Sequence, residues 1–171
     1  MTPITPEQIR AGFVNASKRE VAKATLPTTE TFDAIDWEQR EYLGWRDPKL
    51  ESTAYLALEL DGELRVVLLR RAKEPKVRRK KMCILCEDVV NLDDVSMYSA
   101  SLAGPAGRKG DTIGTFICTD FICSANVRRP PTFKAGGVDE EARAYIVGRR
   151  IDGLRERSAR FVAQVLGGAA S

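Results

Sequence analysis

Cysteine spacing is the feature that most constrains this chain. The sequence holds four cysteines in two close pairs, Cys83-x2-Cys86 and Cys118-x4-Cys123, and no histidine. Two thiolates offered by one tight turn can grip a single ion, and two such turns complete the tetrahedral shell that Zn²⁺ prefers. The pattern therefore predicts one zinc ion bound by Cys83, Cys86, Cys118 and Cys123.

Such a site is expected to be structural. Four thiolates leave no open position at which the ion could activate water, and a binding free energy of roughly 10–16 kcal/mol goes into folding. The absence of histidine excludes histidine-based acid–base catalysis, and no carboxylates show the spacing of an active site. Two alternatives are four buried cysteines without metal and a redox-active Cys-x2-Cys pair, and the second cysteine pair argues against both. We expect a binding protein and not an enzyme.

Composition places the chain among soluble globular proteins. Its 171 residues are about one domain in length, with 43% hydrophobic and 30% charged residues. The longest aliphatic run, residues 66–69, is far shorter than the roughly 20 residues of a membrane span, and the first 20 residues lack the apolar core of a signal peptide. We interpret the protein as cytoplasmic, with reduced thiols and no disulfides.

Short helices are predicted for the N-terminal part of the chain. Thr5 and Pro6 begin a capping-box pattern, and the helix that follows should end before Pro27. Residues 24–31 then form a linker. A second short helix is expected over Asp36–Leu43, before a Gly- and Pro-containing segment.

The remaining residues predict two β-hairpins and a long helix. Residues 54–71 have the pattern of two strands joined by Asp61-Gly62, a two-residue turn signal. Residues 95–118 have the pattern of a second hairpin, whose loop is GPAGRKGD; this loop lacks the Lys-Ser/Thr ending of a phosphate-binding loop. From Val138 to Leu166, apolar residues recur on one face of a helix.

Charge is segregated along the chain. Residues 1–64 carry 7 basic and 12 acidic side chains, whereas residues 65–81 carry nine basic side chains and one acidic side chain. Such a segment attracts nucleic-acid phosphates or an acidic protein surface, although charge runs are as often solvated surface. The candidate partner-binding residues are Arg78, Arg79, Lys80, Lys81, Arg108, Lys109, Arg128 and Arg129.

Further residues around the cysteines indicate which kind of zinc finger the chain contains. They are the tip Gly107-Arg108-Lys109-Gly110, the pair Gly114-Thr115 and the run from Cys123 to Arg128. Together with the cysteine spacing, they resemble the treble-clef zinc finger of the FusB-type elongation factor G-binding proteins, and the resemblance extends over residues 33–165. It implies binding of elongation factor G through the zinc-finger domain and release of that factor from stalled ribosomes.

The resemblance completes the expected architecture. We expect an α+β fold in which a treble-clef zinc finger is combined with two β-hairpins, a short N-terminal helical arm and a long C-terminal helix. Residues 1–31 would form the N-terminal helix and linker, and residues 32–171 the α+β domain, with residues 82–130 as the zinc-finger core. Family members that confer fusidic acid resistance carry a fuller N-terminal helical bundle, so resistance is not expected here.

Two functions are consistent with these observations. The first is a non-enzymatic zinc-binding protein that binds a translation factor, elongation factor G, at or near the ribosome. The alternative is an rRNA- or other nucleic-acid-binding zinc-finger module that acts through the basic segment 65–81, for which binding would weaken steeply with salt.

Overall fold

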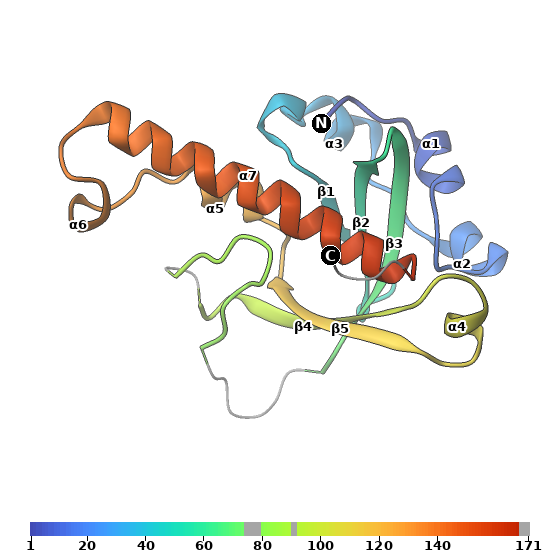
Figure 1. The fold of residues 1–171 in the computed structure, drawn as a ribbon. Helices are drawn as coiled ribbons and strands as arrows, with labels where there is room; N and C mark the ends of the chain where they lie inside the picture. The colour runs from blue at the N-terminus through green and yellow to red at the C-terminus, as the bar shows by residue number, and fades with distance from the viewer. Residues whose placement is uncertain (74–79, 90–91, 168–171) are drawn as a thin grey trace.

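A five-stranded antiparallel sheet forms the centre of the computed structural model, which describes residues 1–73, 80–89 and 92–167. Figure 1 shows the fold. The strands follow one another in chain order across the sheet. They are β1 (Leu43–Arg46), β2 (Thr53–Leu60), β3 (Glu63–Arg71), β4 (Val95–Ser101) and β5 (Thr112–Cys118).

Short helices surround the sheet, and one long helix crosses it. The long helix is α7 (Glu140–Val165). The short ones are α1 (Pro6–Ala11), α2 (Lys18–Lys23), α3 (Thr29–Asp33), the 3-10 helix η1 (Trp37–Gln39), α4 (Gly104–Arg108), α5 (Cys123–Arg128) and α6 (Phe133–Gly136). No helix in the described ranges has the length and apolarity that a bilayer span requires.

The two hairpins of the sheet diverge from each other. β3 and β4 are paired only through Arg70 with Ser99 and Arg71 with Tyr98. Beyond these pairs, β4 and β5 turn away and run across beneath the upright strands β2 and β3 (Figure 1). The second hairpin is therefore free to carry the cysteine cluster at one end and α4 at the other.

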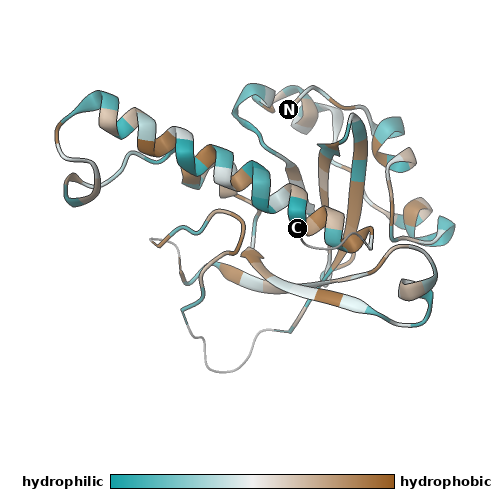
Figure 2. Ribbon diagram, viewed as in Figure 1, coloured by the Kyte–Doolittle hydropathy of each residue, from teal (hydrophilic) through white to brown (hydrophobic). Residues whose placement is uncertain are grey.

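Helices bury both faces of the first hairpin. On one face, Leu56 of β2 and Val67 of β3 share a core with α7 residues such as Leu154. On the other face, Ala57 and Val66 pack with residues of the N-terminal helices. Because both faces are covered, β2 is apolar along most of its length, as the brown strands in Figure 2 show.

The N-terminal helix is shorter than the sequence predicts. The capping box at Thr5 is confirmed, but α1 ends at Ala11 and not just before Pro27. The cause is the free edge of β3: Val66 exchanges backbone hydrogen bonds with Gly12 (2.8 Å) and Val14 (3.0 Å). Since an exposed edge needs hydrogen-bond partners, this tertiary contact replaces helical bonds.

The side chain of Asn15 extends the same edge. Its amide nitrogen donates to the carbonyls of Leu68 and Ser101 (both 3.0 Å), and its amide oxygen accepts from the Leu68 N–H (2.8 Å). Asn15 thereby bridges β3 and β4 where the two strands separate. The chain returns to a helix only at Lys18, and it starts α3 at Thr29, inside the predicted linker 24–31.

Of the remaining elements predicted from the sequence, the structure confirms both hairpins and the long helix but not the second short helix. The hairpin at Asp61-Gly62 is confirmed, with φ values of 54° and 76° that suit a two-residue turn. The second hairpin and the long C-terminal helix are also confirmed, although the loop of the second hairpin contains α4. The helix predicted over Asp36–Leu43 is wrong: only η1 is helical there, and Leu43 already begins β1.

Candidate metal centre

The four cysteines meet in one buried cluster. Their sulfur atoms all lie within 4.8 Å of one another, with 3.5 Å between Cys83 and Cys123 and 3.6 Å between Cys86 and Cys118. All four are free thiols. Four sulfurs about 2.3 Å from a central Zn²⁺ would be about 3.8 Å apart. The cluster therefore has the dimensions of a single tetrahedral zinc site.

Three local structures bring these sulfurs together. Cys83 and Cys86 lie on a turn, here called the zinc knuckle (residues 83–89), in which the Glu87 N–H donates to the Cys83 carbonyl (2.9 Å). The knuckle is fastened to the edge of β5, because the Ile84 N–H donates to the Phe116 carbonyl (2.9 Å). Cys118 is the last residue of β5, and Cys123 is the first residue of α5. A knuckle, a hairpin end and a helix start are the parts of a treble clef.

Aromatic side chains close the cluster on the side of the sheet. Phe121, with a φ of 57°, packs so closely on β1 that a Cβ at Gly44 would lie 2.4 Å from its ring. Tyr42 lies beside the sulfurs: burial, followed by the negative charge that the cysteine cluster carries, raises the pKa of its hydroxyl well above the usual value. The protonated hydroxyl has no hydrogen-bond partner in the described residues, so this buried donor suits a site that carries negative sulfur.

Crowding alters the acidity of the thiols in opposite directions. The pKa of Cys83 is lowered, because hydrogen bonds from Cys118 and then Cys123 stabilise its thiolate. The pKa of Cys123 is raised, because the proton that it shares with Cys118 and then Cys83 stabilises its thiol form. Without an ion, the cluster holds only part of the charge that four thiolates would carry. A divalent cation held by the four sulfurs would supply the compensating charge, and its binding would release the remaining protons.

Asn126 orients two of the sulfurs. Its amide nitrogen donates to Cys118 (3.4 Å) and Cys86 (3.8 Å). Arg129 donates to the amide oxygen of Asn126 (2.8 Å) and binds both carboxylate oxygens of Asp88 (3.1 and 3.2 Å), which fixes the direction of the amide. Hydrogen bonds of this kind hold metal ligands in position and tune their charge. Apart from the position of Asn126 one helical turn after Cys123, no local sequence pattern points to this role.

Asn126→Leu is expected to weaken zinc binding by roughly 10- to 100-fold, because the two sulfurs lose a donor that stabilises their negative charge. Competition with a coloured zinc chelator measures this change. Ala125→Ser, at an exposed position on the same helix, provides the control and should bind zinc as the unaltered protein does. Equal affinities for both variants would show that the amide does not support the site.

Arg128 is held inside the protein by an ion pair. Its guanidinium binds both carboxylate oxygens of Glu41 (both 2.7 Å), and the Glu41 side chain is fully buried. Burial alone would raise the pKa of Glu41, but hydrogen bonds from Arg128 and Ser124 outweigh burial and hold the pKa below its usual value. The bonds from Glu41 in turn raise the pKa of Arg128. This pair joins α5 to the segment before β1.

The candidate partner-binding residues do not form one surface in the described part of the chain. Arg128 and Arg129 serve the intramolecular contacts given above, and Arg108 and Lys109 lie at the α4 end of the second hairpin, away from the cysteines (Figure 1). Lys81 places its ammonium 5.2 Å from the ring centre of Phe116. Lys80 is exposed beside it, whereas Arg78 and Arg79 lie outside the described residues.

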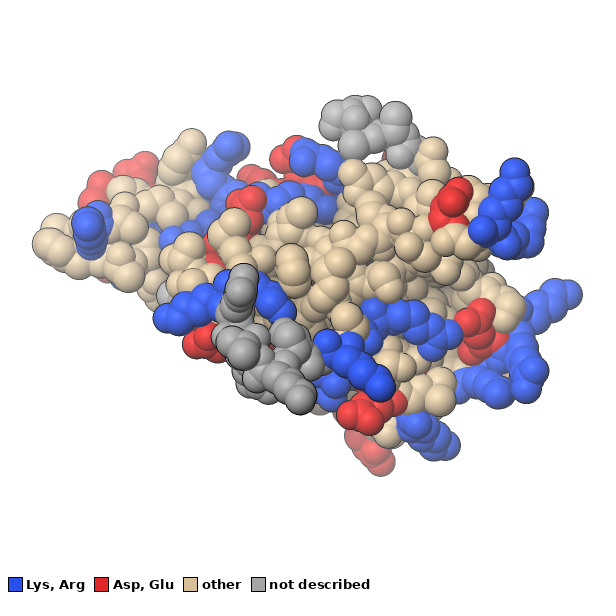
Figure 3. Space-filling model, turned by 90° about the horizontal axis from the view of Figure 1, so that it is seen from below, with Lys and Arg blue, Asp and Glu red and all other residues tan. Residues whose placement is uncertain are grey.

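The basic segment 65–81 is partly neutralised. Arg65 pairs with Glu63, and Arg70 pairs with Glu20 (2.8 Å). Seen from below, the molecule shows Lys and Arg side chains at several separate places around an area without charged groups (Figure 3). The described part of the segment is thus less strongly basic than its sequence suggests.

Residues 8–165 match the family model described as FBP C-terminal treble-clef zinc-finger. The matched range contains the four cysteines and all five strands, and it begins earlier than residue 33, where the resemblance was expected to start. No curated protein and no solved structure matches the chain.

Proposed function

Because this chain belongs to the FBP C-terminal treble-clef zinc-finger family, we propose that it binds elongation factor G, at or near the ribosome. The observation that carries the proposal is the family match over residues 8–165, since FusB-type members of this family bind that factor. The activity is binding and not catalysis, and the location that it requires is the cytoplasm. The clustered cysteines support the proposal because they supply the treble-clef centre that defines the family.

One structural zinc ion, bound by the four cysteines, is part of this proposal. The ion would join the zinc knuckle to the end of β5 and the start of α5, and α7 is tied to the same knuckle by Arg157, which donates to the Leu85 carbonyl (2.8 Å). A structural ion contributes its binding free energy to folding. Zinc would therefore maintain the binding surface without touching the partner.

A calorimetric titration of the zinc-loaded protein with purified elongation factor G tests the function. We expect a saturable heat of binding with one molecule of each protein in the complex and an affinity in the micromolar range or tighter. The same titration with chelator-treated protein is the control and should show no binding, because the surface is lost with the fold. Absence of binding by the zinc-loaded protein at micromolar concentration would refute the proposal.

The rRNA-binding alternative has weaker support. Its basis is Lys80, which is exposed, and its neighbour Lys81, which is half-buried, beside the zinc knuckle; Arg65 and Arg70 are already paired with carboxylates. Binding to phosphates weakens by orders of magnitude between low and moderate salt. Titrations with an rRNA fragment at several salt concentrations would support this alternative if they gave tight, steeply salt-dependent binding.

A further inference from the structure

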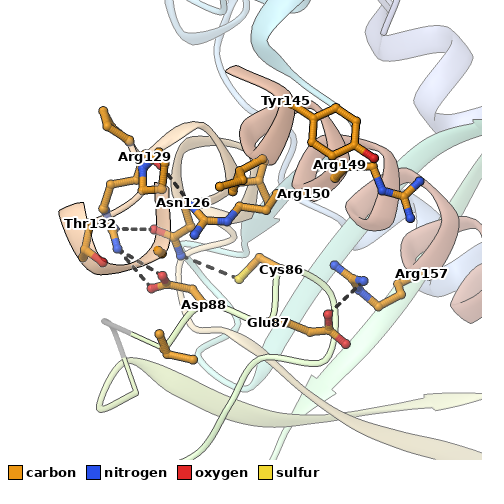
Figure 4. A pocket seen from close by; sticks show the side chains of 16 residues that line it. Cys86, Glu87, Asp88, Asn126, Arg129, Thr132, Tyr145, Arg149, Arg150 and Arg157 are labelled. Carbon is orange, nitrogen blue, oxygen red and sulfur yellow. Dashed lines mark hydrogen bonds and ion pairs between the residues drawn. The ribbon is translucent and has the colours of Figure 1, made fainter. Parts of the chain in front are cut away.

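A groove of about 630 Å³ lies between the zinc knuckle and α7 (Figure 4). Cys86 of the metal centre is on its wall, and the N-terminal half of α7 forms the opposite side. Much of the lining is apolar: Val89, Val127, Pro130, Pro131, Tyr145 and Ile146. A cavity of this size with apolar walls accepts a bulky side chain and the backbone around it.

Four arginines surround these apolar walls, and two of them are already paired. Arg129 binds Asp88, and Arg157 binds Glu87 (2.9 Å), as the dashed lines in Figure 4 show. Arg149 and Arg150 have no carboxylate partner in the described ranges, and Arg149 is exposed. The groove therefore presents two uncompensated positive charges beside an apolar floor.

The groove is held open by contacts of the protein itself. Arg150 donates to the Arg129 carbonyl (3.1 Å), which ties α7 to the chain after α5. Arg157 ties the same helix to the knuckle through the Leu85 carbonyl. A partner would therefore meet a formed surface and would lose little free energy in ordering it.

Exposed apolar side chains continue from the groove onto its outer rim. Tyr145 is 70% exposed, and Phe133 of α6 and Val138, which precedes α7, are 73% and 82% exposed. The region that carries them, α6 with the N-terminal half of α7, extends beyond the sheet (Figure 1). Large apolar residues gathered at a cationic groove are typical of a protein-binding surface.

The charges distinguish between two kinds of partner. A nucleic acid would bring phosphates close to Glu87 and Asp88, which line the groove and neutralise two of its arginines. Its backbone would also gain nothing from the apolar floor. An acidic protein segment can place carboxylates on the two unpaired arginines and an apolar side chain between the proline-rich wall and α7. Charge-assisted bonds of this kind are strong and directional.

We propose that this groove binds an acidic segment of a partner protein, with one bulky apolar side chain of that segment seated on Pro131 and Ile146 and its carboxylates on Arg149 and Arg150. The assignment of that segment to elongation factor G rests on the proposed function. The chemistry of the segment rests on the groove alone.

The test uses the zinc-loaded chain and fluorescein-labelled peptides. The sequence Glu-Asp-Leu-Phe-Glu-Asp is compared with Gln-Asn-Leu-Phe-Gln-Asn, which lacks the charges, and with Glu-Asp-Ala-Ala-Glu-Asp, which lacks the apolar anchor. Fluorescence anisotropy should show the first peptide binding at least about tenfold more tightly than either of the others. Equal affinities, or preferential binding of a labelled oligouridylate, would overturn the proposal.

A charge-reversed variant locates the site. Arg149→Glu, at the exposed arginine that takes no part in holding the groove open, should weaken binding of the first peptide and of elongation factor G by about tenfold or more, while zinc content and thermal unfolding stay unchanged. Arg160→Glu is the control, since Arg160 lies outside the groove on the same helix and pairs with Glu156. Full-strength binding of elongation factor G by the Arg149→Glu variant, when peptide binding is lost, would show that the factor binds elsewhere, which refutes the assignment of the segment to that factor and leaves the proposed function standing. Unchanged peptide binding by this variant would refute the groove as the peptide site. Peptide binding without binding of elongation factor G would refute the proposed partner alone.

Discussion

Cys118→Ser is expected to abolish zinc binding and, with it, the cooperative unfolding transition. Cys118 ends β5 and lies 3.6 Å from Cys86, so its loss opens the sulfur cluster between the hairpin and the knuckle. A structural zinc ion contributes roughly 10–16 kcal/mol, whereas a whole domain is stable by about 5–15 kcal/mol. Elemental analysis and thermal unfolding followed by circular dichroism measure both effects.

Removal of zinc from the unaltered protein tests the same prediction without a substitution. A strong chelator should produce the same loss of the transition, and added zinc should restore it. Thr112→Ser, at an exposed position of the same strand, is the control for the substitution and should keep one zinc ion per chain. A variant that lacks metal but still unfolds cooperatively at the temperature of the unaltered protein would show that the cysteines are not a structural metal site.

The parts of this fold that depend only on residues close together in the chain could be predicted from the sequence. The capping box at Thr5 and the Asp61-Gly62 turn depend on residues within four positions of each other, and both are confirmed. The two cysteines of each pair are also close in the chain, three positions apart in Cys83-x2-Cys86 and five in Cys118-x4-Cys123. Such features can be predicted from a single sequence because no distant part of the chain competes with them.

The N-terminal helices show where this kind of prediction ends. The apolar pattern around Phe13 favours a continuing helix, but the edge of β3 needs partners, and the backbone of residues 12–14 supplies them. Since β4 pairs with β3 only at Arg70 and Arg71, the part of that edge that precedes Arg70 has no strand partner, and the need arises from the divergence of the two hairpins. One signal was available: β2 is apolar along most of its length, which requires a cover on both faces of the sheet.

The surroundings of the metal centre were less predictable than its sulfurs. Glu41 and Arg128 are 87 positions apart in the chain, and nothing in the local sequence links them. Arg128 therefore looked like one of several surface cations. Burial of its partner depends on the packing of α5 against the segment before β1, which only the tertiary structure reveals.

Arg128→Ala should cost about 3–5 kcal/mol of unfolding free energy at pH 7, because it leaves the carboxylate of Glu41 buried without its partner. For a protein of this size, that loss lowers the melting temperature by roughly 10 °C. Arg155→Ala is the matched control. Arg155 also approaches Glu41 (4.0 Å), but its side chain is 61% exposed, so its removal should cost less than about 1 kcal/mol.

The second substitution, Glu41→Gln, separates loss of the charge pair from loss of packing. The pKa of Glu41 is below its usual 4.5, so its ion pair contributes fully above that pH and is lost as the pH falls through the lower folded value. At pH 7 the carboxylate is therefore charged, and its isolation in Arg128→Ala is what destabilises the protein. Adding Glu41→Gln to that variant removes the charge and should restore about 2 kcal/mol or more. If the double variant is no more stable than Arg128→Ala alone, the arginine acts through its contacts with Ser124 and Glu38, and the buried charge is not the cause.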